Sequence, residues 1–236
     1  MRKAILILPL LLAGALLVAC TAAPSAPATS SARAESASAS APGATDAAGG
    51  ATCTYTADGQ AARPVALPPQ AGVPDSGTAV ASIALGAATV RVTLDRAATP
   101  CTVNSFLSLA RQGFYDGTAC HRLVDGPGLF VLQCGDPTGT GSGGPGYAFD
   151  DELTGSETYP AGTLAMANAG PGTNGSQFFF VYADSQLPPN YTVFGHTDAA
   201  GVAVVASIAA GGQDRAYPDG SGRPVEPATI VGVTEG

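Results

Sequence analysis

The chain has 236 residues, with 31 glycines, 19 prolines, no tryptophan and 6% aromatic residues. This length predicts one domain with tails. Eighteen acidic residues outnumber ten basic ones, and Lys3 is the single lysine. Binding to nucleic acid and electrostatic adhesion to anionic lipid both need a basic surface, so the composition argues against both.

The first twenty residues have the pattern of an export signal. Arg2 and Lys3 supply the positive start, and an apolar run covers residues 5–18. The run ends in the letters LVAC, which resemble a bacterial lipobox, whose cysteine receives the lipid. An uncleaved membrane helix is the alternative, but the apolar run is short for a spanning helix. We therefore expect lipidation at Cys20 and stable anchoring to the outer face of the cytoplasmic membrane.

Composition divides the rest of the chain into three parts. Residues 21–52 are rich in Ala, Ser and Pro with almost no large apolar side chains, which predicts a disordered tether of roughly thirty residues. Residues 53–77 contain several prolines and little periodicity, so we expect an extended lead-in that lies on the domain. The folded domain is expected at 78–236.

Four cysteines remain once the lipobox cysteine is set aside: Cys53, Cys101, Cys120 and Cys134. An even number in an exported protein suggests two disulfides, and three connectivities are possible. Buried free thiols are one alternative. A zinc site that includes His121 is another, although no close Cys-x-x-Cys pair is present, and we expect no metal.

The first regular elements are two strands and a helix. Residues 79–85 suit a strand, and residues 89–94 alternate between apolar and polar side chains, as a half-buried antiparallel strand does. A helix is expected to begin at Thr99-Pro100, where threonine can cap and proline suits the first helical position. Gly113 is expected to end it.

Two further strands, 120–124 and 129–134, are joined by the turn 125–128. The glycine run 139–146 then satisfies the G-x-G-x-x-G pattern. A dinucleotide site is excluded by context, because Pro145 follows and no βαβ unit surrounds the run. We interpret the run as a shaped surface loop near a substrate groove.

Residues 162–180 combine an apolar entry, a middle rich in glycine and asparagine, and three phenylalanines. This pattern predicts strand, shaped loop and strand, and such a loop suits the binding of an extended peptide. A strand at 191–195, a helix at 199–210 and a last strand at 229–233 follow. Together these elements predict a mainly β protein, a closed antiparallel β-barrel of about eight strands capped by two α-helices.

Three segments carry a family resemblance: ACHRLVDGPGLFVLQCGDPTGTGSGGPGYAFDDE from Ala119, GTLAMANAGPGTNGSQFFF from Gly162, and LPPNYTVFG from Leu187. In this order they resemble the bacterial form of the cyclophilin family of peptidyl-prolyl cis/trans isomerases, over about residues 78–234. The resemblance implies a cyclophilin-like fold and catalysis of rotation about X–Pro bonds. It also implies proline-containing polypeptides as partners and no cofactor.

The resemblance implies that Arg122 and Gln133 are catalytic. The uncatalysed barrier to X–Pro rotation is about 18–20 kcal/mol. A guanidinium that hydrogen-bonds the twisted amide would lower it, and Gln133 would orient that guanidinium. The turn 125–128 is longer than is usual in the family, which bears on the direction in which Arg122 points. His121 is expected to be structural.

The resemblance also assigns a substrate groove. The residues it implies are Phe130, Val131, Phe179 and Leu187 for the proline pocket, Ala167, Asn168 and Ala169 for backbone pairing, and Gln177 and Tyr191 along the groove. Core packing is the alternative for each apolar residue. Gln186 stands where many eukaryotic members have the tryptophan that helps bind cyclosporin. We therefore expect weak cyclosporin binding, which submicromolar inhibition would contradict.

The leading prediction is a monomeric isomerase that assists the folding of exported proteins. The alternative is a proline-peptide binding module with little or no turnover. A serine hydrolase would need a nucleophile beside a histidine. Ser176 and His196 are available, but no nucleophile-elbow motif surrounds the serine.

Overall fold

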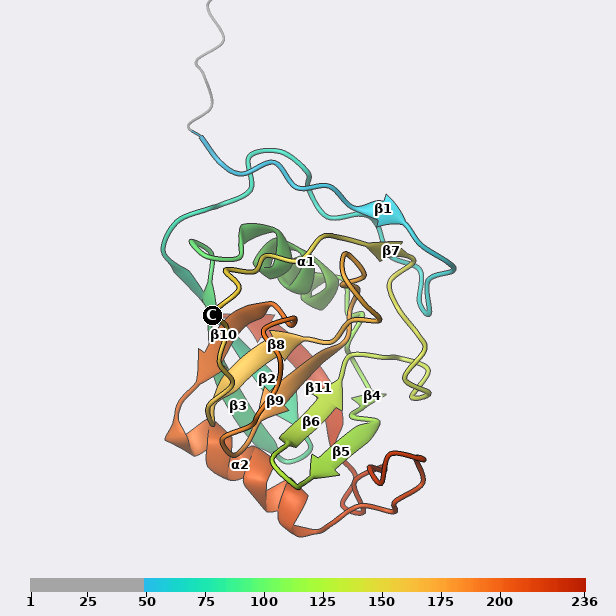
Figure 1. Ribbon diagram of the computed structural model, residues 1–236. Helices are drawn as coiled ribbons and strands as arrows, with labels where there is room; N and C mark the ends of the chain where they lie inside the picture. Colours follow the sequence, from blue (N-terminus) through green and yellow to red (C-terminus); the bar gives the residue numbers. More distant parts are fainter. Residues whose placement is uncertain (1–48) are drawn as a thin grey trace, which may run out of the picture. The chain divides into compact units, whose positions relative to one another are not determined.

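The computed structural model describes residues 49–236 (Figure 1). The predicted signal segment, the lipidation site Cys20 and nearly all of the predicted tether lie outside these residues. In the described part of the chain, no helix combines the length and the apolar character that crossing a bilayer requires.

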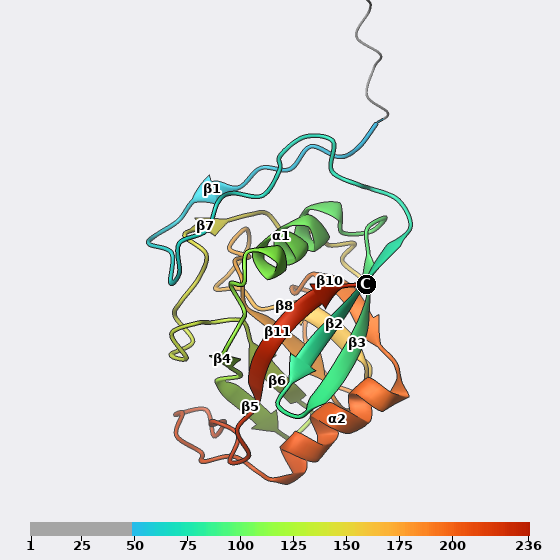
Figure 2. The ribbon, with the colours of Figure 1, turned by 180° about the vertical axis from the view of Figure 1, so that it is seen from behind.

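One curled antiparallel sheet of nine strands forms the body of the domain (Figures 1 and 2). Its strands follow the order β4-β11-β2-β3-β10-β8-β9-β6-β5. Their bounds are β2 Thr78–Leu85, β3 Ala88–Asp95, β4 Thr118–Ala119, β5 Arg122–Asp125, β6 Phe130–Cys134, β8 Thr163–Met166, β9 Phe178–Val181, β10 Val193–Thr197 and β11 Thr229–Glu235. A separate two-stranded ladder pairs β1 (Thr56–Ala57) with β7 (Tyr147–Ala148).

The prediction of a closed barrel of about eight strands is wrong in both respects. The sheet has nine strands, and its end strands β4 and β5 do not pair with each other. The reason lies in the chain path, because only Cys120 and His121 separate β4 from β5 and the two strands follow one another end to end. The first pairs with β11 and the second with β6, so chain continuity, not a hydrogen-bonded ladder, joins the two ends of the sheet.

Two helices cover opposite ends of the curled sheet: α1 (Pro100–Arg111) and α2 (Ala199–Ala210) (Figures 1 and 2). Phe106 of α1 anchors the interior, with its ring centroid 5.4 Å from those of Phe178 and Phe194. The predicted alternation of β3 is confirmed, since its apolar side chains are fully buried and their neighbours are more exposed. The interior of the curled sheet is therefore filled by aromatic and branched side chains, and any binding surface must lie outside it.

The start of α1 differs from the prediction. Thr99 is the N-cap residue but its side chain makes no capping bond; its hydroxyl instead donates to the Asp95 carbonyl. The Glu152 carboxylate takes its place, accepting from the Cys101 and Thr102 amides at 2.9 and 2.8 Å. A carboxylate satisfies the free amides and complements the helix dipole better than a hydroxyl, which explains why a distant residue replaces the local cap.

The prediction of two disulfides is confirmed, with Cys53 joined to Cys101 and Cys120 joined to Cys134. The first ties the lead-in to the start of α1, and the β1–β7 ladder holds the lead-in a second time. The second lies beside the β5–β6 pair. The second disulfide therefore joins the residue before His121 and Arg122 to the residue after Gln133, on the hairpin that carries the candidate site.

Candidate active site

The predicted catalytic residues and the centre of the predicted pocket form one row across three neighbouring strands. Arg122 of β5 lies opposite Gln133 of β6, which lies opposite Phe179 of β9. Paired residues project to the same face of a sheet, and neighbouring strands lie about 4.8 Å apart. Residues far apart in the sequence are thus brought to one outer face.

An apolar cluster occupies the same face next to this row. Val124, Val131 and Val181 form the adjacent row of the sheet, and Phe179 continues the cluster. The ring of Tyr191 packs against that of Phe179, with centroids 5.7 Å apart. Leu187, Tyr191 and Ala167 pack against the same cluster and remain partly exposed, so an apolar edge reaches the surface beside the row that Arg122 begins.

Phe130 lies apart from this apolar cluster. It alternates with Val131 along β6 and therefore projects to the other face of the strand. Its ring packs edge-on against Tyr182, with centroids 5.9 Å apart, and its amide is bonded to the Ser185 hydroxyl. Of the four residues predicted to line a proline pocket, the structure brings Val131, Phe179 and Leu187 together and leaves Phe130 at the rim of the sheet.

The longer turn between β5 and β6 does not disturb their register. Arg122 pairs with Gln133 and Asp125 with Phe130, so the extra residues are confined to the turn. The turn is fixed to the loop beside the apolar cluster, because Gln186 donates its amide proton to the Gly128 carbonyl at 2.7 Å. The longer turn therefore does not change the position of Arg122 on β5, and the direction of its side chain depends on the contacts of the guanidinium.

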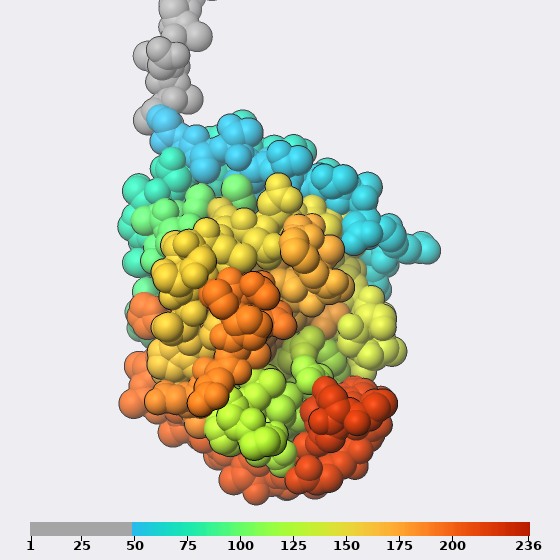
Figure 3. All heavy atoms as spheres, viewed as in Figure 1, coloured from blue at the N-terminus to red at the C-terminus, as the bar shows by residue number. Residues whose placement is uncertain are grey.

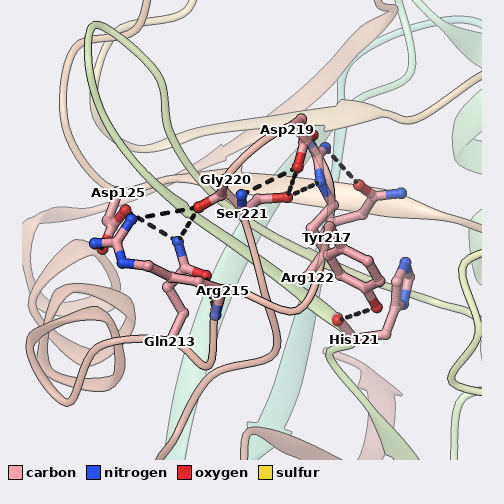
Figure 4. Close-up of polar contacts among 10 residues, drawn as sticks. His121, Arg122, Asp125, Gln213, Arg215, Tyr217, Asp219, Gly220 and Ser221 are labelled. Atoms are coloured by element: carbon pink, nitrogen blue, oxygen red, sulfur yellow. Dashed lines mark hydrogen bonds and ion pairs between the residues drawn. The ribbon is translucent and has the colours of Figure 1, made fainter.

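Three side chains hold the Arg122 guanidinium (Figure 4). Its Nε donates to the Ser221 hydroxyl at 2.8 Å, its Nη2 to Asp219 at 2.6 Å and its Nη1 to Gln133 Oε1 at 3.4 Å. A guanidinium has five N–H donors. One N–H on each terminal nitrogen therefore remains for a substrate, and the side chain is 30% exposed.

A second contact extends this network into the predicted groove. Gln133 donates from Nε2 to Gln177 Oε1 at 2.9 Å, and Gln177 in turn donates to the carbonyls of Gly141 and Gly143. The buried Asp136 carboxylate shapes this glycine loop by accepting the amides of Gly141 and Gly143. Each amide side chain of the network thus has a fixed orientation.

The segment Ala167–Ala169 forms one wall of a hollow of about 540 Å³, which Gln133, Gln177 and the glycine loop also line. Ala167 is bonded to Gln177 through its amide, and Ala169 to the Thr173 hydroxyl. In the described part of the chain, the backbone N–H of Asn168 makes no hydrogen bond to the protein. It is therefore free to pair with an extended peptide.

Asp219 and Ser221 are functional candidates that sequence reasoning missed. They belong to the loop between α2 and β11, 97 and 99 residues from Arg122, and no local pattern relates them to it. The same loop carries Tyr217, whose hydroxyl donates to the His121 carbonyl at 3.0 Å (Figure 4). A loop that appeared only polar in the sequence therefore positions the central guanidinium.

His121 and Ser176 do not support acid–base or nucleophilic chemistry. Burial lowers the pKa of His121, more than the nearby Asp136 raises it, so the imidazole is neutral at pH 7. Ser176 is buried in the loop before β9 and donates to the Gly135 carbonyl, whereas His196 is an exposed residue of β10. Among residues 49–236, no group of three potential ligands could hold a metal ion.

Comparison with known proteins gives a consistent result. The family model described as "Cyclophilin type peptidyl-prolyl cis-trans isomerase/CLD" matches residues 80–235. The probable peptidyl-prolyl cis-trans isomerase B of Mycobacterium tuberculosis is 47% identical over 199 residues, covering 78% of this chain and 63% of that protein. Its Mycobacterium leprae counterpart is 50% identical, covering 77% and 65%. The chain thus spans less than two thirds of these relatives.

Solved structures show the same fold. A cyclophilin-type isomerase of Cryptosporidium parvum superimposes with a TM-score of 0.59 at 29% identity, covering 68% of this chain and 98% of its own. The structure of that protein in the presence of the dipeptide Ala-Pro gives 0.56 at 30% identity, covering 66% and 97%. With a family model that matches most of its length, the chain belongs to the cyclophilin-type peptidyl-prolyl cis-trans isomerase family.

Proposed function

We propose that the protein is a peptidyl-prolyl cis/trans isomerase that accelerates rotation of X–Pro bonds in exported polypeptides. One observation carries this proposal: a guanidinium with two unused N–H groups lies in one row with Gln133 and Phe179, beside an apolar edge. The relative from Cryptosporidium parvum, crystallised in the presence of Ala-Pro, supports a proline-containing substrate.

The chemistry needs no covalent step. At the twisted stage of the rotation the amide nitrogen loses conjugation and becomes a hydrogen-bond acceptor. The free N–H groups of Arg122 would bind that nitrogen or the shifting carbonyl, while the apolar edge at Leu187 and Tyr191 would hold the proline ring. A hydrogen bond made only at the twisted stage lowers the barrier, and every 1.36 kcal/mol gives a tenfold change in rate.

The test is a protease-coupled assay on a proline tetrapeptide with wild type and Arg122→Ala. Because removal of one preorganised donor typically costs about 10²–10³ in rate, we expect a loss of kcat of about a hundredfold. Arg91→Ala is the matched control, since Arg91 is an exposed arginine of β3 outside the site, and it should retain the wild-type rate. Equal rates in wild type and Arg122→Ala would overturn the catalytic assignment.

A binding module with little turnover is the second candidate. Phe130 lies apart from the apolar cluster and Val131 is short, so the proline contact is reduced compared with a pocket that four large side chains would form. A binding module would hold proline peptides with equal affinity in wild type and Arg122→Ala, and neither protein would accelerate isomerisation.

Export and lipid anchoring form a separate part of the proposal, and the sequence around Cys20 motivates it. The two disulfides support an oxidising compartment. Full chains carrying Cys20 or Cys20→Ser should be compared by detergent phase partition and by intact mass. We expect the wild type to enter the detergent phase with the mass of added acyl chains and the variant to stay in the aqueous phase. Identical partition would refute the anchor.

A further inference from the structure

The hollow beside Ala167–Ala169 has a wall that does not come from the matched family domain. Asp58, Gly59 and Gln60, which follow β1, line it together with the glycine loop and Gln177. The family model begins at residue 80, so these residues belong to the lead-in. Figure 3 shows the lead-in on the same face as the glycine loop (yellow-green) and the segment after β8.

The lead-in is fixed firmly enough to form part of a binding surface. The Asp58 amide donates to the Gly146 carbonyl at 3.0 Å and the Ala62 amide to Gly144 at 2.8 Å, so both flanks of the wall are bonded to the glycine loop. Further along, Arg63 donates to the carbonyls of Phe114 and Asp116 at 3.1 and 2.6 Å. These bonds and the disulfide of Cys53 hold residues 58–60 against the hollow.

The hollow has one charge. Of the described residues that line it, Asp58 alone carries a charged side chain, and the others are glycines, alanines, one proline and neutral polar or aromatic residues. Asp58 is exposed, and within residues 49–236 it takes part in no ion pair. The adjacent hollow on the other side of Asp58 adds a second carboxylate, Asp150. A cationic side chain entering from the groove would therefore meet negative potential and no cation among the lining residues, since the charge of Arg122, which is bonded to the lining residue Gln133, is paired with Asp219.

We propose that Asp58 makes this hollow an acidic subsite, which selects substrates with a lysine or arginine close to the isomerised proline. The hollow shares Gln133 with the catalytic row and Ala167–Ala169 with the expected peptide track, so a residue near the proline reaches it. The inference rests on the proposed isomerase function and names the substrate class. The long side chain of the substrate's lysine or arginine would lie along the glycine loop and place its charge at Asp58.

The experiment measures kcat/KM by NMR exchange on proline peptides that carry Lys, Gln or Glu at each of the positions flanking the proline. With the full chain we expect Lys to exceed Glu about fivefold at one position, as suits a partly screened ion pair. Asp58→Asn should abolish this preference, Asp58→Lys should reverse it, and high salt should weaken it. Asp75→Asn is the matched control, because Asp75 is exposed on the same lead-in and lies outside the hollow.

The outcomes separate the subsite from the isomerase. Wild-type turnover that is equal for Lys and Glu at every position refutes the subsite and leaves the isomerase standing. An equal loss of preference in Asp58→Asn and Asp75→Asn also refutes it, since the effect would then come from the overall negative charge. If no peptide is turned over, the proposed isomerase function is refuted. The same peptides are then ranked by equilibrium binding, where the absence of a Lys preference refutes the subsite.

Discussion

Replacing Asp219 with asparagine tests whether the loop between α2 and β11 positions the Arg122 guanidinium for the proposed catalysis. The carboxylate accepts from Arg122 Nη2 at 2.6 Å and from the Ser221 amide and hydroxyl at 3.0 and 2.6 Å. Ser221 in turn holds Arg122 Nε. Loss of the charge would therefore weaken both the direct contact and the partner that completes it.

The magnitude follows from the exposure of the pair. Arg122 and Asp219 are 30% and 53% exposed, so the ion pair belongs to the class that contributes about 0.2–1 kcal/mol. Freeing an arginine side chain restores at most about 2 kcal/mol of rotamer entropy, which must be removed again in the transition state. At 1.36 kcal/mol per tenfold, the variant should lose about fivefold in kcat and at most about thirtyfold.

The pH profile adds a second readout. Hydrogen bonds from the Ser221 hydroxyl and amide, with a smaller contribution from Arg122, lower the pKa of Asp219 to about 2. The carboxylate is therefore ionised throughout the range in which the enzyme would be assayed. We expect the ratio of wild-type to Asp219→Asn rates to be constant from pH 5 to pH 8, and a ratio that changes in this range would contradict the assignment.

The assay is the protease-coupled rate on a proline tetrapeptide, with kcat and KM determined separately. Asp214→Asn is the matched control, because Asp214 orders the same loop through the amides of Ala216 and Arg223 and does not contact Arg122. A loss of kcat in Asp219→Asn alone supports positioning. Equal losses in both variants, or a change in KM with kcat preserved, would refute it and indicate general loosening of the loop.

Three further predictions concern stability. Replacing Cys53 and Cys101 by alanine opens a crosslink that spans 48 residues, so urea unfolding should show a loss of about 4 kcal/mol. Glu152→Gln removes the charged cap of α1 and should cost about 1–2 kcal/mol, measured in the same way. Burial opposes ionisation of Asp136, but hydrogen bonds from Thr138, Gly143 and Gly141 outweigh it and lower its pKa below the ordinary 3.8. The ionised Asp136 carboxylate therefore contributes fully to the free energy of unfolding above about pH 4, and this contribution is lost as the pH falls through the lowered pKa. Asp136→Asn should flatten this acid dependence of the free energy of unfolding.

Elements with a strong local pattern could be predicted from the sequence. The strand–loop–strand of residues 162–180 is present as β8 and β9, because its apolar ends demand burial and its glycine-rich middle cannot continue a strand. The helix at 199–210 has the predicted bounds. The site row also follows from short motifs, since Arg122 and Gln133 fall within one hairpin whose register carries them together.

Features that depend on distant partners could not be predicted. The ladder of β1 and β7 has two residues on each side, too few for any periodicity. The sheet does not close because the segment of β4 and β5 changes its partner strand from β11 to β6. The alternation of side chains along the segment does not indicate where this change occurs. The assignment of Phe130 to the proline pocket came from the family resemblance, whereas alternation along β6 directs its side chain to the opposite face from Val131.

The proposed catalytic row and the proposed acidic subsite come from different parts of the chain. The guanidinium, its amide partner and the apolar edge come from β5, β6 and β9 and from the loop around Leu187, all within the matched domain. The charge that faces the adjoining hollow comes from the lead-in, which is held in place by a disulfide and by bonds to the glycine loop. The proposed subsite therefore predicts that changes at Asp58 alter which peptides are chosen without moving Arg122. Changes at Asp219 should alter the rate for every peptide by the same factor, and the ratio of Lys to Glu peptides in Asp219→Asn provides the check.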